Sequence, residues 1–148
     1  MPKTIKNIYD NSVSFENLLK AHKKARCGKR EKKKIILFEL KLEQELLELD
    51  KQLKNGRYKH GGYTKFKIYE PKERIIMASE YKDRVVHQWY VEKFIKPYFV
   101  PQFISTSYAG IEGRGMHKAS KDVQKAMRSA KSKWKNYYIL KMDVTKYF

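Results

Sequence analysis

The chain has 148 residues, enough for one domain of ordinary size. Lysine and arginine total 34 against 16 acidic residues, so the formal charge is +18, while hydrophobic residues make up 41% of the chain. That hydrophobic content argues against wholesale disorder. A charge of this size favours a polyanionic partner, and nucleic acid is the commonest one; an anionic membrane surface is the alternative.

The sequence also argues against several classes of protein. No apolar run approaches the roughly 18–20 residues that a membrane-spanning helix needs, and the start MPKTIKNIYDN lacks the apolar core of a secretory signal. Cys27 is the only cysteine, so no internal disulfide can form, and the four histidines are scattered singly. We therefore expect a cytoplasmic chain, not bound to a membrane, without a structural zinc site.

The first part of the chain has the pattern of amphipathic helices. Residues 12–28 predict a helix that Ser14 caps and Gly28 ends. A longer helix with a stop at Gly56 is expected over residues 32–55, because apolar side chains recur there at three- and four-residue steps. These side chains are Phe38, Leu42, Leu46, Leu49 and Leu53. Fewer than four clean heptads are present, so the stripe indicates core packing better than a coiled coil.

The middle of the chain changes to a strand pattern and then returns to a helical one. Period-two alternation over residues 63–69 turns at Pro71 and resumes over residues 74–78, which predicts a β-hairpin with one apolar face. A helix capped by Ser79 and ended by Pro97 should follow. Its expected buried face consists of Val85, Val86, Trp89, Tyr90 and Phe94.

After a turn-rich stretch over residues 100–115, the sequence predicts one more helix and a final strand. The apolar face of the helix consists of Met116, Ala119, Val123, Met127 and Ala130. Its opposite face is basic enough to lie along a phosphate backbone and carries Lys118, Lys121, Lys125, Arg128 and Lys131. The final strand is expected over residues 137–144. No repeat or linker divides the chain, so we treat it as one unit.

Asp143 stands at the end of this hydrophobic strand. A carboxylate there is costly unless a cation compensates it, and either a basic side chain or a divalent metal could do so. The two-metal sites of phosphoryl transfer combine carboxylates from different segments. The chain has no Asp-Asp pair, since its aspartates are Asp10, Asp50, Asp83, Asp122 and Asp143. If Asp143 binds a metal, we expect its partners beyond residue 148 or in another chain.

Several motifs together resemble a known family. YILKMDVTKYF resembles the first catalytic motif of bacterial reverse transcriptases, in which a hydrophobic strand and an Asp precede paired aromatic residues. PKERIIMASEYKDRVVHQWYVEKFIKPYF is similar to the fingers segment, and SYAGIEGRGMHKAS is similar to the loop that leads into the next helix. The likeness runs from Tyr63 to Phe148, in order and in spacing. It is closer to the enzymes of diversity-generating retroelements than to group II intron maturases.

The resemblance implies an α+β fold and a polymerase activity. Residues 1–60 would form a basic helical extension, residues 61–135 the fingers, and residues 136–148 the first palm strand. The complete protein would be an RNA-directed DNA polymerase, which extends a DNA primer on an RNA template with deoxynucleoside triphosphates and two Mg²⁺ ions. The second catalytic motif, Tyr-x-Asp-Asp, is absent. We therefore expect this chain alone to be inactive, and the remainder of the palm and the thumb to lie beyond residue 148.

The resemblance also assigns roles to residues near the end of the chain. Asp143 matches the first metal-binding aspartate, and the carbonyl of Val144 would help to hold the same ion. Phe148 falls at the aromatic steric gate that distinguishes deoxyribonucleotides by their missing 2′-hydroxyl.

Other positions match contacts to the nucleotide and the nucleic acid. Arg74 matches the arginine that clamps the incoming triphosphate. Lys67 would be the accompanying lysine, with Lys65 and Lys72 as less favoured choices. The residues expected near the template or the nucleic-acid backbone are Arg84, Arg114, Lys118, Lys121 and Lys125.

Each assignment has a simpler alternative. Arg84 could form a surface ion pair with Asp83, Arg114 could serve only its glycine turn, and His117 is better explained by packing or capping. The basic stretch over residues 20–34 is either a solvated surface or a phosphate contact. Glu112 stands where relatives carry a basic residue, which weakens template contact by that loop. For the whole chain, the alternative function is a non-catalytic, basic RNA-binding module; a membrane-surface protein is less favoured because the charge is spread over several elements.

Overall fold

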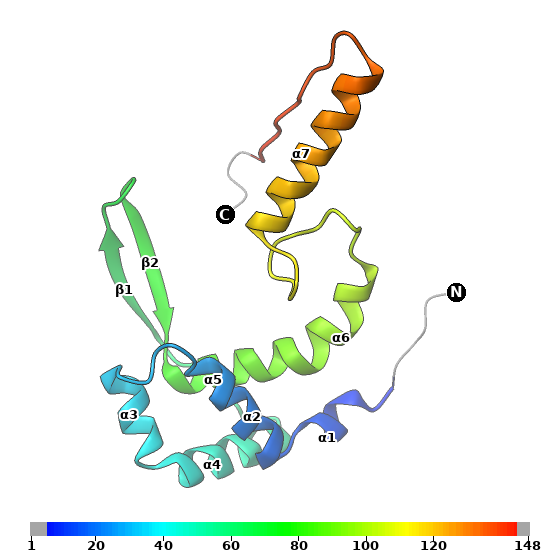
Figure 1. Ribbon diagram of the computed structural model, residues 1–148. Helices are drawn as coiled ribbons and strands as arrows, with labels where there is room; N and C mark the ends of the chain where they lie inside the picture. Colours follow the sequence, from blue (N-terminus) through cyan, green and yellow to red (C-terminus); the bar gives the residue numbers. More distant parts are fainter. Residues whose placement is uncertain (1–5, 145–148) are drawn as a thin grey trace. The chain divides into compact units, whose positions relative to one another are not determined.

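A computed structural model describes residues 6–144 of the protein, and its fold is α+β, as expected (Figure 1). The chain divides into two compact units, Met1–Pro101 and Gln102–Phe148. The boundary falls at a point where the sequence contains no recognisable linker. The elements of the first unit are α1 (Ile8–Ser12), α2 (Phe15–Ala25), α3 (Lys33–Glu39), α4 (Leu42–Lys54), β1 (Tyr63–Ile68), β2 (Arg74–Ser79), α5 (Tyr81–Tyr90), a π-helical turn (Val91–Ile95) and α6 (Lys96–Phe99).

Helix α2 forms where the sequence predicts a helix, although it is shorter. Ser14 caps it as expected, because the backbone N–H of Asn17 donates to the Ser14 Oγ at 3.3 Å. The helix ends at Ala25, and Gly28 lies in the turn beyond it with a φ of +67°, a conformation that favours glycine. Ser12, which was expected in this helix, belongs instead to the separate short helix α1.

The single helix expected over residues 32–55 is two helices. The chain breaks between α3 and α4 at Lys41, whose φ and ψ of −123° and 28° are not helical. A straight helix would separate Ile35 from Leu53 by about 27 Å, too far for both to enter one small core. The break lets both side chains be buried, and the stripe residues Phe38, Leu46 and Leu49 are buried with them, which confirms core packing.

The core of the first unit is formed by four helices: α2 and α3 pack against α5, and α4 packs against α2 and α3 (Figure 1). Leu18, Leu46 and Val85 are fully buried there. The indole N–H of Trp89 donates to the carbonyl of Ser12 at 2.9 Å, so its polar atom is satisfied inside the core. Tyr90 was also expected on the buried face of α5, and this prediction is wrong, because half of its surface is exposed.

Helix α5 begins and ends differently from the prediction. Its N-cap is Glu80, because Ser79 is the last residue of β2. Pro97 does not end the helical path, which continues through the π-helical turn into α6. Lys96 donates its N–H to the carbonyl of Val91, five residues back, and this wider turn places Pro97 in the first turn of α6, where a missing N–H is tolerated.

The predicted hairpin is confirmed. Strands β1 and β2 are antiparallel (Figure 1). Tyr63 faces Ser79 at one end, and Ile68 faces Arg74 at the other. Apolar side chains do share one face of the hairpin, as expected, but this face is not buried. Phe66, on that face, is about half exposed, so the hairpin does not rest on the core along its length.

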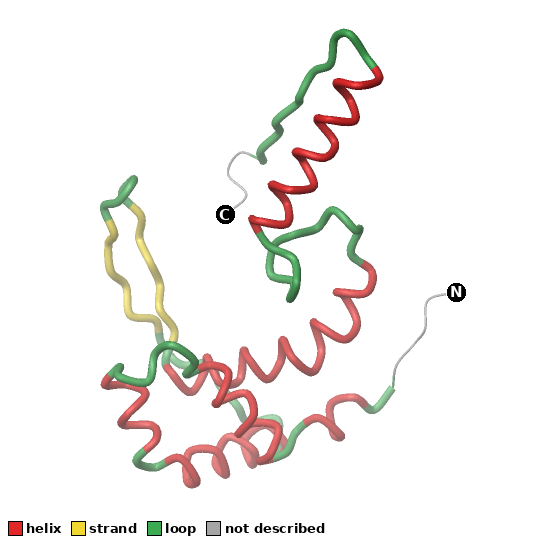
Figure 2. The backbone as a smooth tube through the Cα atoms, in the orientation of Figure 1, coloured by secondary structure: helices red, strands yellow, loops and turns green. Residues whose placement is uncertain are grey.

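The second unit contains α7 (Met116–Lys133) with a turn-rich stretch before it and an extended segment after it (Figure 2). The helix matches its prediction. The strand expected over residues 137–144 is wrong, because this stretch pairs with no other strand among residues 6–144. A strand needs a hydrogen-bonding neighbour, and a hydrophobic sequence does not supply one.

Candidate nucleic-acid interface

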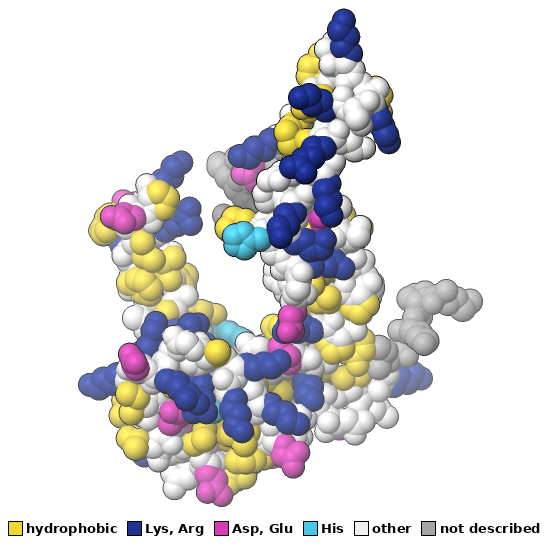
Figure 3. Space-filling view, in the orientation of Figure 1, with side chains coloured by type: hydrophobic (Ala, Val, Ile, Leu, Met, Phe, Trp, Pro, Cys, Tyr) yellow, Lys and Arg dark blue, Asp and Glu magenta, His cyan; other side chains and the backbone are white. Residues whose placement is uncertain are grey.

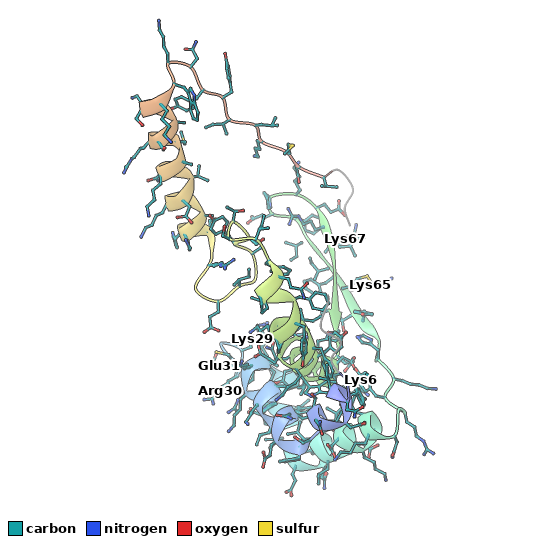
Figure 4. The ribbon with its side chains drawn as sticks, turned by 90° about the vertical axis from the view of Figure 1, so that its right-hand side faces the viewer. Lys6, Lys29, Arg30, Glu31, Lys65 and Lys67 are labelled. Carbon is teal, nitrogen blue, oxygen red and sulfur yellow. The ribbon has the colours of Figure 1, made fainter. Side chains whose placement is uncertain are left out.

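The hairpin presents its basic residues on two different faces. Directly opposed residues of an antiparallel pair share a face, so Lys65 and Lys67 lie with Met77 and Ile75, whereas Arg74 lies with Ile68 on the other face. Figure 4 shows Lys65 and Lys67 on the hairpin. The Nζ atom of Lys67 pairs with Oε1 of Glu73 at 2.5 Å.

This register bears on the predicted triphosphate clamp. Arg74 is exposed near the turn, but Lys67 projects from the opposite face, so the hairpin does not bring this pair together. Lys72 lies in the turn itself, two residues from Arg74, and is exposed. Of the lysines considered for this role, Lys65 shares the face of Lys67.

Asp83 holds the root of the hairpin. Its side chain is fully buried and accepts hydrogen bonds from the Tyr58 hydroxyl at 2.6 Å and from the Gly61 backbone N–H at 3.0 Å. A Cβ at Gly61 would lie 2.9 Å from Asp83 Oδ2, so only glycine fits this approach. Burial, and next the hydrogen bond to Asp83, raise the pKa of Tyr58 well above its ordinary value. In the sequence, the signal for this role is that Asp83 stands beside Val85 and Val86, which were expected to be buried.

Arg84 is half-buried and contacts the end of β2. Its Nε donates to the carbonyl of Ser79 at 3.2 Å. The alternative of a surface ion pair with Asp83 is wrong, because Asp83 is buried and its oxygens accept from Tyr58 and Gly61.

His22 is the centre of a second buried polar group, which joins α2, α3 and α5. Its Nε2 lies 3.2 Å from Oε1 of Glu39, and its Nδ1 lies 3.0 Å from the Tyr81 hydroxyl. A carboxylate can only accept, so Nε2 carries the proton and Nδ1 accepts from Tyr81. Burial, and next the charge of Arg26, lower the pKa of His22. Burial raises the pKa of Tyr81 to about 12.

Arg26 completes this group through its ion pair with Glu39, and that hydrogen bond lowers the pKa of the Glu39 carboxyl. His22 is fully buried and closed to a ligand, while Arg26 and Glu39 are partly exposed at the edge of the group. Its role is to fix three helices against one another.

The basic stretch of α2 borders a surface pocket of about 380 Å³ between α2 and α5. Lys24 Nζ pairs with Oε2 of Glu92 at 2.5 Å, and Lys96 pairs with the other oxygen of the same carboxylate. Lys29 and Arg30 follow in the exposed loop after α2, where Figure 4 labels them. Part of the basic stretch is therefore held in an ion pair within the protein, and its exposed loop can contact an anion.

In the second unit, Arg114 organises the turn-rich stretch. Its Nη1 donates to the carbonyls of Ile104 at 3.1 Å and Ser107 at 3.3 Å. Gly113 beside it has a φ of +71°. Both bonds bind one end of the Arg114 guanidinium to the protein's own backbone. They support the alternative that Arg114 serves the glycine turn.

Helix α7 carries the expected basic face, and its lysines differ in their partners. Lys118 Nζ lies 2.7 Å from Oδ2 of Asp122, which also accepts from the Tyr108 hydroxyl. These two hydrogen bonds lower the pKa of Asp122. Lys121 and Lys125 are exposed and make no ion pair within residues 6–144. Figure 3 shows Lys and Arg side chains along α7. His117 was expected to serve packing or capping; it is exposed, which contradicts packing, and the N-cap of α7 is Gly115.

Asp143 and Val144 lie in the exposed extended segment after α7. Asp143 Oδ1 accepts the backbone N–H of Val144 at 3.0 Å, and the carboxylate forms no ion pair with any described residue. In the same part of the chain, no three His, Cys, Asp or Glu side chains gather as metal ligands. Phe148 lies outside the described residues.

No protein-family model matches the sequence, and no curated protein matches it either. Among the described helices, none combines the length and the apolar character that crossing a membrane requires.

Proposed function

We propose that this chain is the N-terminal part of an RNA-directed DNA polymerase of the bacterial reverse transcriptase type, with its first 60 residues as a basic extension and its hairpin and following helices as the fingers. The observation that carries the proposal is the order of its motifs along the chain. The hairpin with Arg74 comes first, the Asp-Arg-Val-Val start of α5 next, the glycine turn with Arg114 third and Asp143 last.

Asp143 is the proposed anchor of the catalytic metal. A carboxylate and the Val144 carbonyl are hard oxygen donors, which suit Mg²⁺, and the Asp143 side chain is exposed without a cationic partner among the described residues. Two such ions would lower the pKa of the primer 3′-hydroxyl and neutralise charge on the pyrophosphate. Further carboxylates are required for this site, and none of the other four aspartates belongs to the same segment.

Arg74 is the proposed contact to the incoming triphosphate. Its exposed guanidinium can form two parallel hydrogen bonds with a phosphate group. With Lys67 on the opposite face of the hairpin, Lys72 in the turn is the better accompanying lysine. Phe148 remains the proposed steric gate. Arg84, Arg114 and the lysines of α7 remain proposed contacts to nucleic acid.

The test is primer extension by the product of the whole gene, on an RNA template with a DNA primer, deoxynucleoside triphosphates and Mg²⁺. We expect extension that stops when EDTA removes the metal, and no extension by residues 1–148 alone. A stop codon directly after Phe148, together with a gene product that extends no primer, would contradict the proposal.

A non-catalytic RNA-binding module is the second candidate. The charge of +18 and the exposed basic face of α7 favour it, since they suffice for salt-sensitive binding with little sequence preference. The candidates differ in their response to Mg²⁺ and nucleotide. A nucleotide-dependent change in RNA affinity supports the polymerase, whereas an affinity that ignores both supports the module.

A further inference from the structure

The root of the hairpin carries a short run of stacked rings on the surface of the first unit. The ring of His60 lies 4.9 Å from that of Tyr63, with 25° between the planes, and 5.3 Å from that of His87, with 21° between the planes. All three residues are exposed, and Tyr63 is 50% accessible. From this geometry we infer that the three rings are a binding site for an unpaired nucleobase of single-stranded RNA.

An exposed stack of rings is suited to such a ligand. A nucleobase exposes two aromatic faces when it is unpaired, and proteins that bind single strands commonly stack such bases on aromatic side chains beside basic groups. His60 already stacks with both neighbours, so the accessible surface of Tyr63 is the part that can take a base. Rings that served only to hold the hairpin on α5 would be expected inside the core, as Trp89 is.

The charges around the stack favour a nucleic acid over a neutral aromatic ligand. Lys65 and Lys67 share the hairpin face of Tyr63, at successive alternate positions along β1. A strand that places a base on Tyr63 can therefore run its backbone along the two ammonium groups. Glu73 pairs with Lys67 there, but both side chains are about half exposed, and such a pair exchanges readily with a phosphate. Glu80 and the buried Asp83, both near Gly61, are the opposing charges at the root.

The stack is also held in place before a ligand arrives. Asp83 binds the Gly61 N–H and the Tyr58 hydroxyl, on either side of His60 in the chain, so the His60 backbone is fixed to α5. Its Oδ2 lies 3.9 Å from His60 Nε2 as well. A site that is ordered in advance loses less entropy when it binds.

This inference rests on the RNA-binding part of the proposed function, and it adds the site that recognises the base. The experiment measures the affinity of the full chain for a single-stranded RNA of about 12 nucleotides and for an abasic ribose-phosphate strand of the same length. Both ligands carry the same number of phosphates, so the ratio of their affinities measures the contribution of the bases. We expect the RNA to bind about tenfold more tightly or better.

Tyr63→Leu should remove this preference while changing the affinity for the abasic strand less than about twofold. Tyr69→Leu is the matched control, because Tyr69 is an exposed tyrosine in the hairpin turn outside the stack, and it should keep the preference. Melting temperatures establish that both variants are folded. A second readout is the fluorescence of the tryptophan introduced by Tyr63→Trp. The RNA should quench this fluorescence, and the abasic strand should not.

Equal affinity of the original chain for the two strands would overturn the inference, and so would a preference that survives Tyr63→Leu. In either case salt-sensitive binding would persist, and the proposed function would stand. Failure to bind either strand would count against both.

Discussion

The helical body of the first unit and the stretch from residue 102 to residue 144 obtain their structure in different ways. Every buried residue of the described chain lies in the first unit, between Ser12 and Trp89. In the second unit, Val123 and Met116 on the apolar face of α7 are exposed, and so are the hydrophobic residues that follow the helix. The first unit has a core of its own, whereas the second is a helix with local contacts.

The polar contacts differ in the same way. In the first unit, buried Asp83 and His22 join segments that are distant in sequence, through Tyr58, Glu39 and Tyr81. In the second unit, the hydrogen bonds of Arg114 and Lys118 span ten residues or fewer, and the one from Tyr108 to Asp122 spans fourteen. A basic surface carried on local structure can adapt to a ligand, and a surface anchored on a core is fixed before binding.

The largest expected effect contrasts one apolar side chain in each unit. Leu46→Ala should lower the free energy of unfolding by about 3 kcal/mol, because Leu46 is fully buried and its loss leaves a cavity. Val123→Ala on α7 should change it by less than about 0.5 kcal/mol. Urea denaturation measures both values. If both variants lost the same free energy of unfolding, α7 would have to be packed in solution, and the two units would not differ as described.

A pair of aspartates sharpens the contrast. Asp83→Asn should cost about 2 kcal/mol, because an amide cannot replace a carboxylate as acceptor from both Tyr58 and Gly61. Asp143→Asn should leave stability unchanged, because within residues 6–144 the exposed carboxylate accepts a hydrogen bond only from the backbone of the next residue. Thermal denaturation compares the two variants. A destabilised Asp143→Asn would reveal a structural partner for that carboxylate.

The buried His22 predicts a pH dependence that belongs to the first unit. Its folded pKa is lowered from the ordinary 6.5, so below that pH the unfolded chain binds a proton that the folded chain does not. The free energy of unfolding should therefore fall as the pH drops below 6.5 toward the folded pKa. Glu39 affects stability in a separate pH range. Its pKa is lowered in the folded chain, so the stability that it adds is lost only as the pH falls below about 4.5.

Denaturant titrations from pH 7 to pH 5 measure this dependence, with His22→Gln and His117→Gln as the compared variants. The dependence should shrink in His22→Gln. It should persist in His117→Gln, since His117 is exposed on α7. The same slope in both variants would show that other groups cause it.

The smallest effect on stability is expected on the basic face of α7. Lys121→Gln combined with Lys125→Gln should leave the melting temperature unchanged, because both side chains are exposed and unpaired within residues 6–144. If each contacts one phosphate, the slope of log affinity against log salt should fall by about 0.7 per lysine on single-stranded RNA. Lys51→Gln, on the acidic helix α4, is the control that should leave the slope unchanged.

Local patterns predicted the parts of the fold that local chemistry determines. Ser14 as a cap, the hairpin around Pro71 and helix α7 all follow from short-range signals. The break at Lys41 and the helical path through Pro97 depend on what the helices pack against, which spacing along the chain does not contain.

The site could be predicted only in part for the same reason. Asp143 and Arg74 stand out by residue type and position, and both are exposed as a binding role requires. Strand register decides that Lys67 and Arg74 lie on opposite faces, and the burial of Asp83 depends on segments more than twenty residues apart. The strand expected at the end of the chain needs a neighbour that these residues do not provide.

Asp143 is the proposed metal anchor for nucleotidyl transfer, and single-nucleotide incorporation tests this role most directly. The product of the whole gene is compared with its Asp143→Asn and Asp10→Asn variants on an RNA template and DNA primer in Mg²⁺. We predict that Asp143→Asn lowers the incorporation rate at least about 100-fold, while Asp10→Asn, an exposed aspartate of α1, keeps it. Incorporation that survives Asp143→Asn would contradict the claim.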